Sequence, residues 1–177
     1  MLARYHELTA KVDAFFARVA ARHADELVCA AGCDGCCQVR LTITAIEADA
    51  IVAWAATRPA EERRAIAAAA GAADPTVARC AALDGDGRCR VYDARPLVCR
   101  SHGLPIRLRD GRSLPVIESC ELTFRTRGPA AADADCVLDQ TLVSTTLGLI
   151  DRAHAEAHGR TPGARVDLAD VLAALEP

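Results

Sequence analysis

The sequence predicts a mainly α-helical protein with one or two small β-hairpins. Its loop-rich cysteine cluster is expected to be organised by metal and packed between N- and C-terminal helices. Helical periodicity at both ends of the chain and turn signals in the cysteine-rich middle indicate this class. Of 177 residues, 51% are hydrophobic but only 3% aromatic, so small side chains build the core. A bound metal would therefore contribute to the stability of the fold. We expect one domain over residues 1–177, with its motif region at 29–120.

The charge and composition of the chain argue against several classes of function. The net charge of −3 gives no reason to expect binding to nucleic acid or to an anionic membrane. Lys11 is the only lysine, and this arginine-rich composition resembles that of GC-rich bacteria. No segment has the apolar run of a signal peptide or the ~20 apolar residues of a membrane span. We therefore expect a cytoplasmic protein, and nine cysteines, an odd number, then argue against a disulfide framework.

The first half of the chain predicts three helices and one loop. Residues 2–25 have an i, i+4, i+7, i+11 apolar stripe, typical of an amphipathic helix: Leu8, Val12, Phe15 and Val19. The glycines between Cys29 and Cys37 favour a loop around a ligand. Thr44-Ala-Ile-Glu47 is a capping box that opens a helix through about Thr57. Pro59 suits the start of another helix, which Gly71 ends.

The second half predicts hairpins followed by helices. Asp84-Gly-Asp-Gly87 indicates a turn in a small hairpin, and a second hairpin is expected from 106–110 and 112–117. Between them, 91–100 is expected to hold a short helix started by Asp93, with Pro96 in its first turn.

Two further helices are expected at the C-terminal end. After an Ala/Pro/Asp-rich loop at 128–135, a long helix is predicted over 136–158, and a final helix over 166–175. The apolar face of the long helix is expected to be Leu138, Leu142, Leu149 and Ala153.

The cysteines favour a soft-metal site, because thiolates bind zinc, copper(I) and iron–sulfur cores better than hard cations. They occur as an upstream group and an isolated series: Cys29, Cys33, Cys36, Cys37, Cys80, Cys89, Cys99, Cys120 and Cys136. This spacing lacks the two chelating pairs of a zinc finger. Because successive side chains tend to diverge, Cys36 and Cys37 are expected to bind different metal atoms. The sequence therefore predicts either a polynuclear metal centre or two neighbouring metal sites.

Other nitrogen and sulfur groups are weaker candidates. His102 follows Cys99 by three residues, but a surface or supporting role is favoured over ligation. Cys136 is expected to open the long helix as a small buried apolar residue, not as a ligand. The remaining histidines are expected to be solvated on helices: His6, His23, His154 and His158.

Two motifs resemble a known bacterial family. Cys29-x3-Cys33-x2-Cys36-Cys37, then Cys80, then Cys89-Arg-Val-Tyr-Asp-Ala-Arg-Pro-Leu-Val-Cys99-Arg, is similar to the zinc- or iron-chelating CxxCxxCC domain. The first gap is three residues, where the family name implies two. The resemblance implies metal binding, often an iron–sulfur assignment, and no settled reaction. The expected metal ligands are Cys29, Cys33, Cys36, Cys37, Cys80, Cys89, Cys99 and Cys120.

The block around Arg95 has its own physical interpretation. Tyr92 is expected to pack against the site, and Pro96 to fix the turn that delivers Cys99. Arg95 and Arg100 can each offset the negative charge of a multi-thiolate centre, or instead pair with carboxylates such as Asp93 or Glu118.

Three functions stay open at this point. An iron–sulfur protein for electron transfer or a cofactor role is the first, a zinc-organised non-catalytic interaction module the second, and copper(I) or metal trafficking the third. A dithiol redox site at Cys33-Asp-Gly-Cys36 is disfavoured because a third cysteine follows at once. No nucleotide-binding or hydrolase motif is present, so an enzymatic role is neither assigned nor excluded, and the redox or protein partner is not identified.

Overall fold

The computed structural model describes residues 1–175 of the 177-residue chain. These residues form six α-helices, a two-stranded sheet and a three-stranded sheet, which confirms the predicted mainly α class with small β elements. The chain divides into two compact units. Unit 1 comprises Met1–Leu2, Ala31–Pro96 and Ile150–Pro177, and unit 2 comprises Ala3–Ala30 and Leu97–Leu149. The expectation of one domain over 1–177 stays a prediction.

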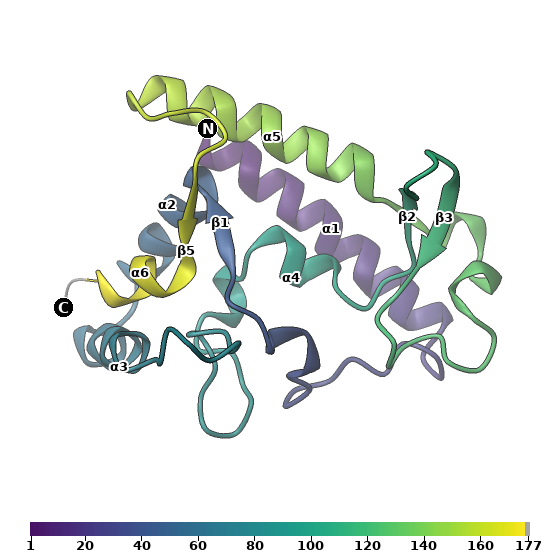
Figure 1. The fold of residues 1–177 in the computed structure, drawn as a ribbon, viewed down its shortest axis with the longest axis horizontal. Coiled ribbons are helices and arrows are strands. Elements are labelled where there is room, and N and C mark those ends of the chain that lie inside the picture. The colour runs from purple at the N-terminus through teal and green to yellow at the C-terminus, as the bar shows by residue number, and fades with distance from the viewer. Residues whose placement is uncertain (176–177) are drawn as a thin grey trace. The chain divides into compact units, whose positions relative to one another are not determined.

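Unit 1 is a small helical unit closed by a two-stranded sheet. Strand β1 (Thr42–Thr44) leads into α2 (Ala45–Ala55) and α3 (Ala60–Gly71), and β5 (Arg165–Asp167) leads into α6 (Leu168–Ala173). β1 and β5 pair antiparallel, with Ile43 opposite Val166 (Figure 1). The buried core of unit 1 consists of aliphatic side chains: Ile43, Ala48, Ile51, Ala55, Ile66, Ala70, Ala82, Val91, Leu168, Leu172 and Leu175.

Unit 2 combines a long helix with a three-stranded sheet. Helix α1 (Leu2–Arg22) and the short α4 (Leu97–Ser101) precede the hairpin of β2 (Ile106–Arg109) and β3 (Pro115–Glu118) (Figure 1). β4 (Leu138–Asp139) adds to β2 in parallel, and α5 (Gln140–Ala157) begins in this unit. Its core consists mainly of aliphatic side chains, with one aromatic ring and one thiol: Val12, Val19, Leu27, Leu97, Leu104, Phe124, Cys136, Leu138 and Val143.

Several local predictions are confirmed, because short-range chemistry decides them. Val12 and Val19 of the predicted α1 stripe are almost fully buried. The Thr44 N–H donates to Glu47 Oε2 at 2.9 Å in the capping box that opens α2. α3 begins after Pro59 and ends at Gly71. The 84–87 turn carries a single antiparallel bridge, Leu83 to Cys89, which is less than a full hairpin.

Three element boundaries differ from the predictions. The segment 91–100 is a 3-10 turn (Tyr92–Ala94) and then α4, because Arg95, which precedes Pro96, takes an extended ψ of 144°. Val166 lies in strand β5, so the last helix starts only at Leu168. Cys136 ends a 3-10 turn instead of opening the long helix, and the strand β4 separates it from α5.

The predicted apolar face of α5 is wrong. Leu142 and Leu149 are each 65% exposed, whereas Asp151 and His154 are 2% and 3% exposed. Asp151 is held inside because its Oδ1 accepts the Ile46 N–H at 3.1 Å at the positive end of α2. Specific polar partners therefore decide which side of the helix is buried, and His154 is not solvated as predicted.

The buried His154 side chain in unit 1 contacts the partly exposed Asp49, which also pairs with Arg160. Its Nε2 lies 2.7 Å from Asp49 Oδ2, and Arg160 Nη1 lies 3.0 Å from both Asp49 oxygens. Burial by itself would raise the pKa of Asp49, but hydrogen bonds from His154 and Arg160 outweigh it and bring the pKa below its ordinary value.

No helix in residues 1–175 combines the length and apolar character that crossing a membrane requires.

Removing the Asp151 carboxylate tests its hydrogen bond with the Ile46 N–H of α2. We expect Asp151→Ala to destabilise the protein by about 1–3 kcal/mol, because it leaves the buried Ile46 N–H without its acceptor. Glu156→Ala on the same helix removes an exposed i, i+4 partner of Arg152 and should change stability by less than about 0.5 kcal/mol. Chemical denaturation of both variants measures the difference, and equal effects would contradict the role given to Asp151.

Candidate metal centre

The first cysteine loop holds two thiols side by side. The chain turns at Gly32, with φ of +89°, and then forms a 3-10 turn over Gly35–Cys37. This turn brings Cys36 Sγ to 3.8 Å from Cys37 Sγ. The expectation that the two neighbouring side chains diverge is therefore wrong. Two thiolates on one tetrahedral ion with 2.3 Å bonds lie about 3.8 Å apart, so this spacing suits a single metal atom.

The downstream cysteines of unit 1 are tied to that loop by backbone contacts. The Cys80 N–H donates to the Cys37 carbonyl at 2.8 Å. The 84–87 turn lies against the loop as well, since a Cβ on Gly87 would be 3.3 Å from the Gly32 carbonyl. Unit 1 thus assembles the loop that carries Cys33, Cys36 and Cys37 next to the segment that carries Cys80 and Cys89.

One ion pair supports the same junction. Arg79 lies 3.8 Å from Asp34 Oδ2 and donates to the Asp84 carbonyl at 3.0 Å. It therefore links the cysteine loop to the 84–87 turn from the position next to Cys80. The sequence interpretation did not single out Asp34 or Arg79, because no spacing rule joins them.

The environment of Cys80 and Cys89 raises the cost of forming thiolates without a metal. Both half-buried side chains pack against the unit 1 core. Burial raises the pKa of the Cys80 thiol, and the neighbouring Cys36 adds to the rise. Burial also raises the pKa of the Cys89 thiol, with Cys80 adding to it. Both thiols are protonated near neutral pH unless a cation compensates the charge.

Each of these two sulfurs also meets a backbone donor from two residues further on. The Ala82 N–H donates to Cys80 and the Val91 N–H donates to Cys89, and each lowers the thiol pKa against the effect of burial. N–H donors to sulfur stabilise the negative charge of a thiolate and of a metal-bound sulfur. At both sulfurs the amide therefore offsets part of the effect of burial.

The block after Cys89, which contains Tyr92 and Arg95, only partly follows expectation. Arg95 lies over the Tyr92 ring at 4.0 Å, and Tyr92 is 59% exposed. Arg100 pairs with a carboxylate, as one alternative predicted, but the partner is Asp13 on α1. His102 is half-buried, and its supporting role stays a prediction.

Unit 2 carries the other predicted ligands, Cys29, Cys99 and Cys120. Gly103 has φ of +93°, and a Cβ there would lie 2.9 Å from Cys29 Sγ. The buried Thr123 hydroxyl lies 2.9 Å from the Gly103 carbonyl and 3.0 Å from the Cys120 carbonyl. The loop after α4, which carries Cys99, therefore lies against Cys29 and is linked through Thr123 to the turn of Cys120.

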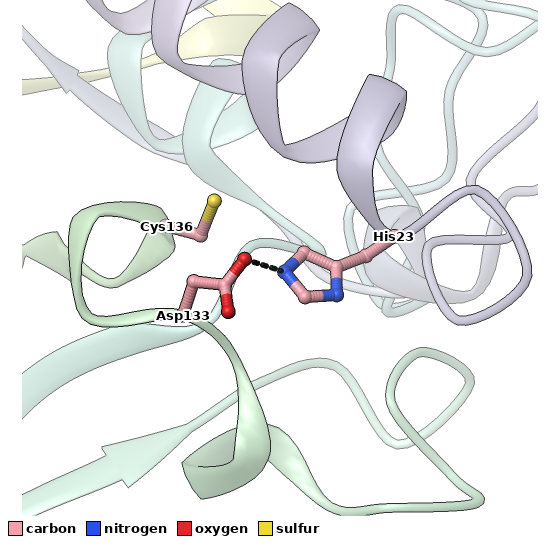
Figure 2. Close-up of side chains that lie close together, drawn as sticks. All are labelled: His23, Asp133 and Cys136. Atoms are coloured by element: carbon pink, nitrogen blue, oxygen red, sulfur yellow. Dashed lines mark ion pairs between the residues drawn. The ribbon is translucent and has the colours of Figure 1, made fainter.

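A different group in unit 2 was missed by the sequence interpretation. One ligand atom each of His23, Asp133 and Cys136 lies within 4.8 Å of the others, and Figure 2 shows His23 and Asp133 pointing toward each other beside Cys136. His23 is 4% exposed, so its predicted solvation is wrong. No local motif joins these residues, because His23 follows α1 and the other two lie in the loop before β4.

Comparison with known proteins supports metal binding. The family model CxxCxxCC, described as "Putative zinc- or iron-chelating domain", matches residues 28–121. This range contains all eight predicted ligands and excludes His23, Asp133 and Cys136. No curated protein and no solved structure matches the chain.

A side chain at Gly103 should disturb the position of Cys29. We expect Gly103→Ala to lower stability by about 1–3 kcal/mol, because alanine resists the left-handed backbone and its Cβ meets the Cys29 sulfur. Gly148→Ala, inside α5 with open space around it, should instead stabilise by about 0.5–1 kcal/mol. Denaturation at fixed metal content compares the two, and a neutral Gly103→Ala would contradict the contact.

The raised thiol pKa values make metal uptake sensitive to pH. Because Cys80 and Cys89 are protonated near neutral pH, a bound metal must displace their protons, and the apparent Kd should fall about tenfold per pH unit for each proton displaced. Titrating the metal-free chain with Zn²⁺ calorimetrically, in buffers of different ionisation enthalpy, counts the protons released. The double variant Cys80→Ser, Cys89→Ser should release about two fewer, and an unchanged count would contradict ligation by these thiols.

Proposed function

This chain belongs to the CxxCxxCC family of zinc- or iron-chelating domains, and we propose that it holds a polynuclear thiolate centre. The proposed centre is an iron–sulfur cluster with a role in electron transfer or as a cofactor. Its proposed ligands are the cysteines of the family region: Cys29, Cys33, Cys36, Cys37, Cys80, Cys89, Cys99 and Cys120.

The backbone N–H donors at Cys80 and Cys89 carry this proposal. Burial disfavours charge on both sulfurs, yet the chain aims an amide at each. Burial removes these thiols from water, whereas the amides stabilise their anionic form. The two effects are compatible when a metal supplies the opposite charge. Hydrogen bonds to the sulfurs are also one of the means by which proteins set the reduction potential of iron–sulfur clusters.

The number and pairing of thiols support more than one metal atom. A tetrahedral ion takes four ligands, and the family region offers twice that number. Cys36 and Cys37 are spaced to bind one metal atom, and each iron of a [2Fe–2S] cluster takes two protein sulfurs. Such a cluster uses four of the eight proposed ligands.

A zinc-organised, non-catalytic interaction module is the second candidate. The 3.8 Å between Cys36 Sγ and Cys37 Sγ favours it, since this is also the spacing of two thiolates on one zinc ion. The divergence of adjacent side chains, which favoured iron–sulfur over zinc from the sequence, does not occur. The thiol count and the sulfur-directed amides remain the reasons for placing iron–sulfur first.

Anaerobic purification separates these candidates. We expect a brown protein with iron and acid-labile sulfide in comparable amounts and a visible spectrum that bleaches on reduction. A colourless protein with one or two zinc ions per chain, unchanged by reduction, would contradict the iron–sulfur assignment and support the zinc module. Metal at trace levels only would contradict both.

Paired variants connect the metal to the proposed ligands. Cys36→Ser with Cys37→Ser should remove most of the iron and sulfide, because it deletes two thiols that lie 3.8 Å apart. Cys136→Ala deletes a cysteine outside the family region and should keep the iron and sulfide content of the unaltered chain. Equal metal loss in both, with both variants folded by circular dichroism, would count against the proposed ligand set.

A further inference from the structure

We propose that His23, Asp133 and Cys136 form a separate binding site for one divalent metal ion of the zinc type. The three side chains lie within unit 2 and outside the family region, which spans residues 28–121. The proposal is independent of the metal bound by the thiolates of the family region.

The distances are close to those of a coordination sphere. His23 Nε2 lies 3.6 Å from Asp133 Oδ2, and the three candidate ligand atoms lie within 4.8 Å of one another. Ligands on one tetrahedral zinc ion, with bonds of 2.0–2.3 Å, lie about 3.3–3.8 Å apart. The His–Asp pair already has this spacing, and the thiol lies within 4.8 Å of both partners, so it moves inward when a metal binds.

The His23 side chain gives independent evidence for a ligand. It is 4% exposed, and its Nε2 has no hydrogen-bond partner, since 3.6 Å to the Asp133 oxygen exceeds hydrogen-bond length. A buried polar atom without a partner costs stability unless another group satisfies it. Figure 2 shows this nitrogen aimed at the Asp133 carboxylate, and the Phe124 ring packs on the imidazole with centroids 5.5 Å apart.

Charge at the site matches a divalent cation. The Cys136 thiolate and the Asp133 carboxylate together supply two negative charges, and the imidazole is neutral when it binds metal. The positively charged Arg22 Nη1 lies 3.7 Å from both Cys136 Sγ and Asp133 Oδ2. The Arg22 side chain is 47% exposed and is also paired with Asp135 at 2.6 Å, so it can stay with Asp135 when a metal takes its place.

Metal binding at His23 Nε2 also changes the contact that Arg127 makes with His23 Nδ1. Arg127 Nη2 lies 3.5 Å from His23 Nδ1, and a guanidinium can only donate. Metal on Nε2 moves the imidazole proton to Nδ1, so Arg127 must withdraw. Its side chain is 50% exposed and is held by Glu26 Oε1 at 3.0 Å, which leaves it a charge partner after that movement.

The ligand types select the ion. One imidazole, one carboxylate and one thiolate suit zinc, whereas Mg²⁺ and Ca²⁺ prefer oxygen ligands throughout. Three protein ligands leave the fourth tetrahedral position for water or an exchangeable group. The carboxylate comes from a residue whose side chain is 60% exposed, so an ion can enter from solvent, while Cys136 is fully buried.

Zinc titration of the full chain, already loaded with its thiolate metal, tests the proposal. The imidazole ¹⁵N resonances report each histidine separately, and His23→Gln identifies the His23 signals. We expect Zn²⁺ to shift the His23 Nε2 resonance in the unaltered chain with a stoichiometry of one. Asp133→Asn should weaken this binding at least ~tenfold, because loss of a ligand costs no less than loss of a supporting contact. Cys136→Ala should weaken it as well.

Asp25→Asn is the matched control. Asp25 is an exposed aspartate two residues after His23, and its substitution makes the same change of charge. It should leave zinc binding at His23 within about twofold of the unaltered chain. A His23 resonance that does not respond to millimolar Zn²⁺, or equal weakening by Asp133→Asn and Asp25→Asn, would overturn the proposal. Metal content at the family-region thiols is measured in the same samples, so loss of that metal is distinguished from loss of this site.

Discussion

The hydrogen bond from the Cys80 N–H to the Cys37 carbonyl, 2.8 Å long, is the contact on which the thiol arrangement of unit 1 depends. It joins the cysteine loop to a segment far along the chain. The close approach of Gly87 to Gly32 and the Arg79–Asp34 pair then hold the same junction from its other side. Because these contacts are made by backbone and by residues other than cysteine, they hold the two thiol-bearing segments next to each other without a metal.

Small side chains make such polar contacts more important. The buried core of unit 1 contains no aromatic residue among its described members, and alanines occupy several of its positions. Such a core buries less apolar area per residue and tolerates more than one packing. Fixed orientation therefore comes from specific polar partners such as Asp151, whose carboxylate accepts an N–H of α2. The same need explains why a metal bound by several thiolates would stabilise this chain strongly.

Short-range signals in the sequence predicted the fold class and several elements. The Thr44–Glu47 capping box, the Pro59 start and Gly71 end of α3, and the Val12 and Val19 positions of α1 all depend on residues within a few positions of each other. Predictions failed where a distant partner decided the outcome. The parallel pairing of β4 with β2 takes Leu138 out of the long helix, and the buried Asp151 turns Leu142 and Leu149 to solvent.

The sequence by itself determined that this chain is a mainly α-helical member of a metal-chelating family, because cysteine spacing, the block ending at Cys99 and helix-capping patterns are local properties. Only the tertiary structure decided that Cys36 and Cys37 lie side by side, that amides meet the sulfurs of Cys80 and Cys89, and that His23, Asp133 and Cys136 converge. The physical reason is that sulfur direction depends on the turn that presents it, and ligand convergence depends on long-range packing. Neither is encoded in the spacing of residues along the chain.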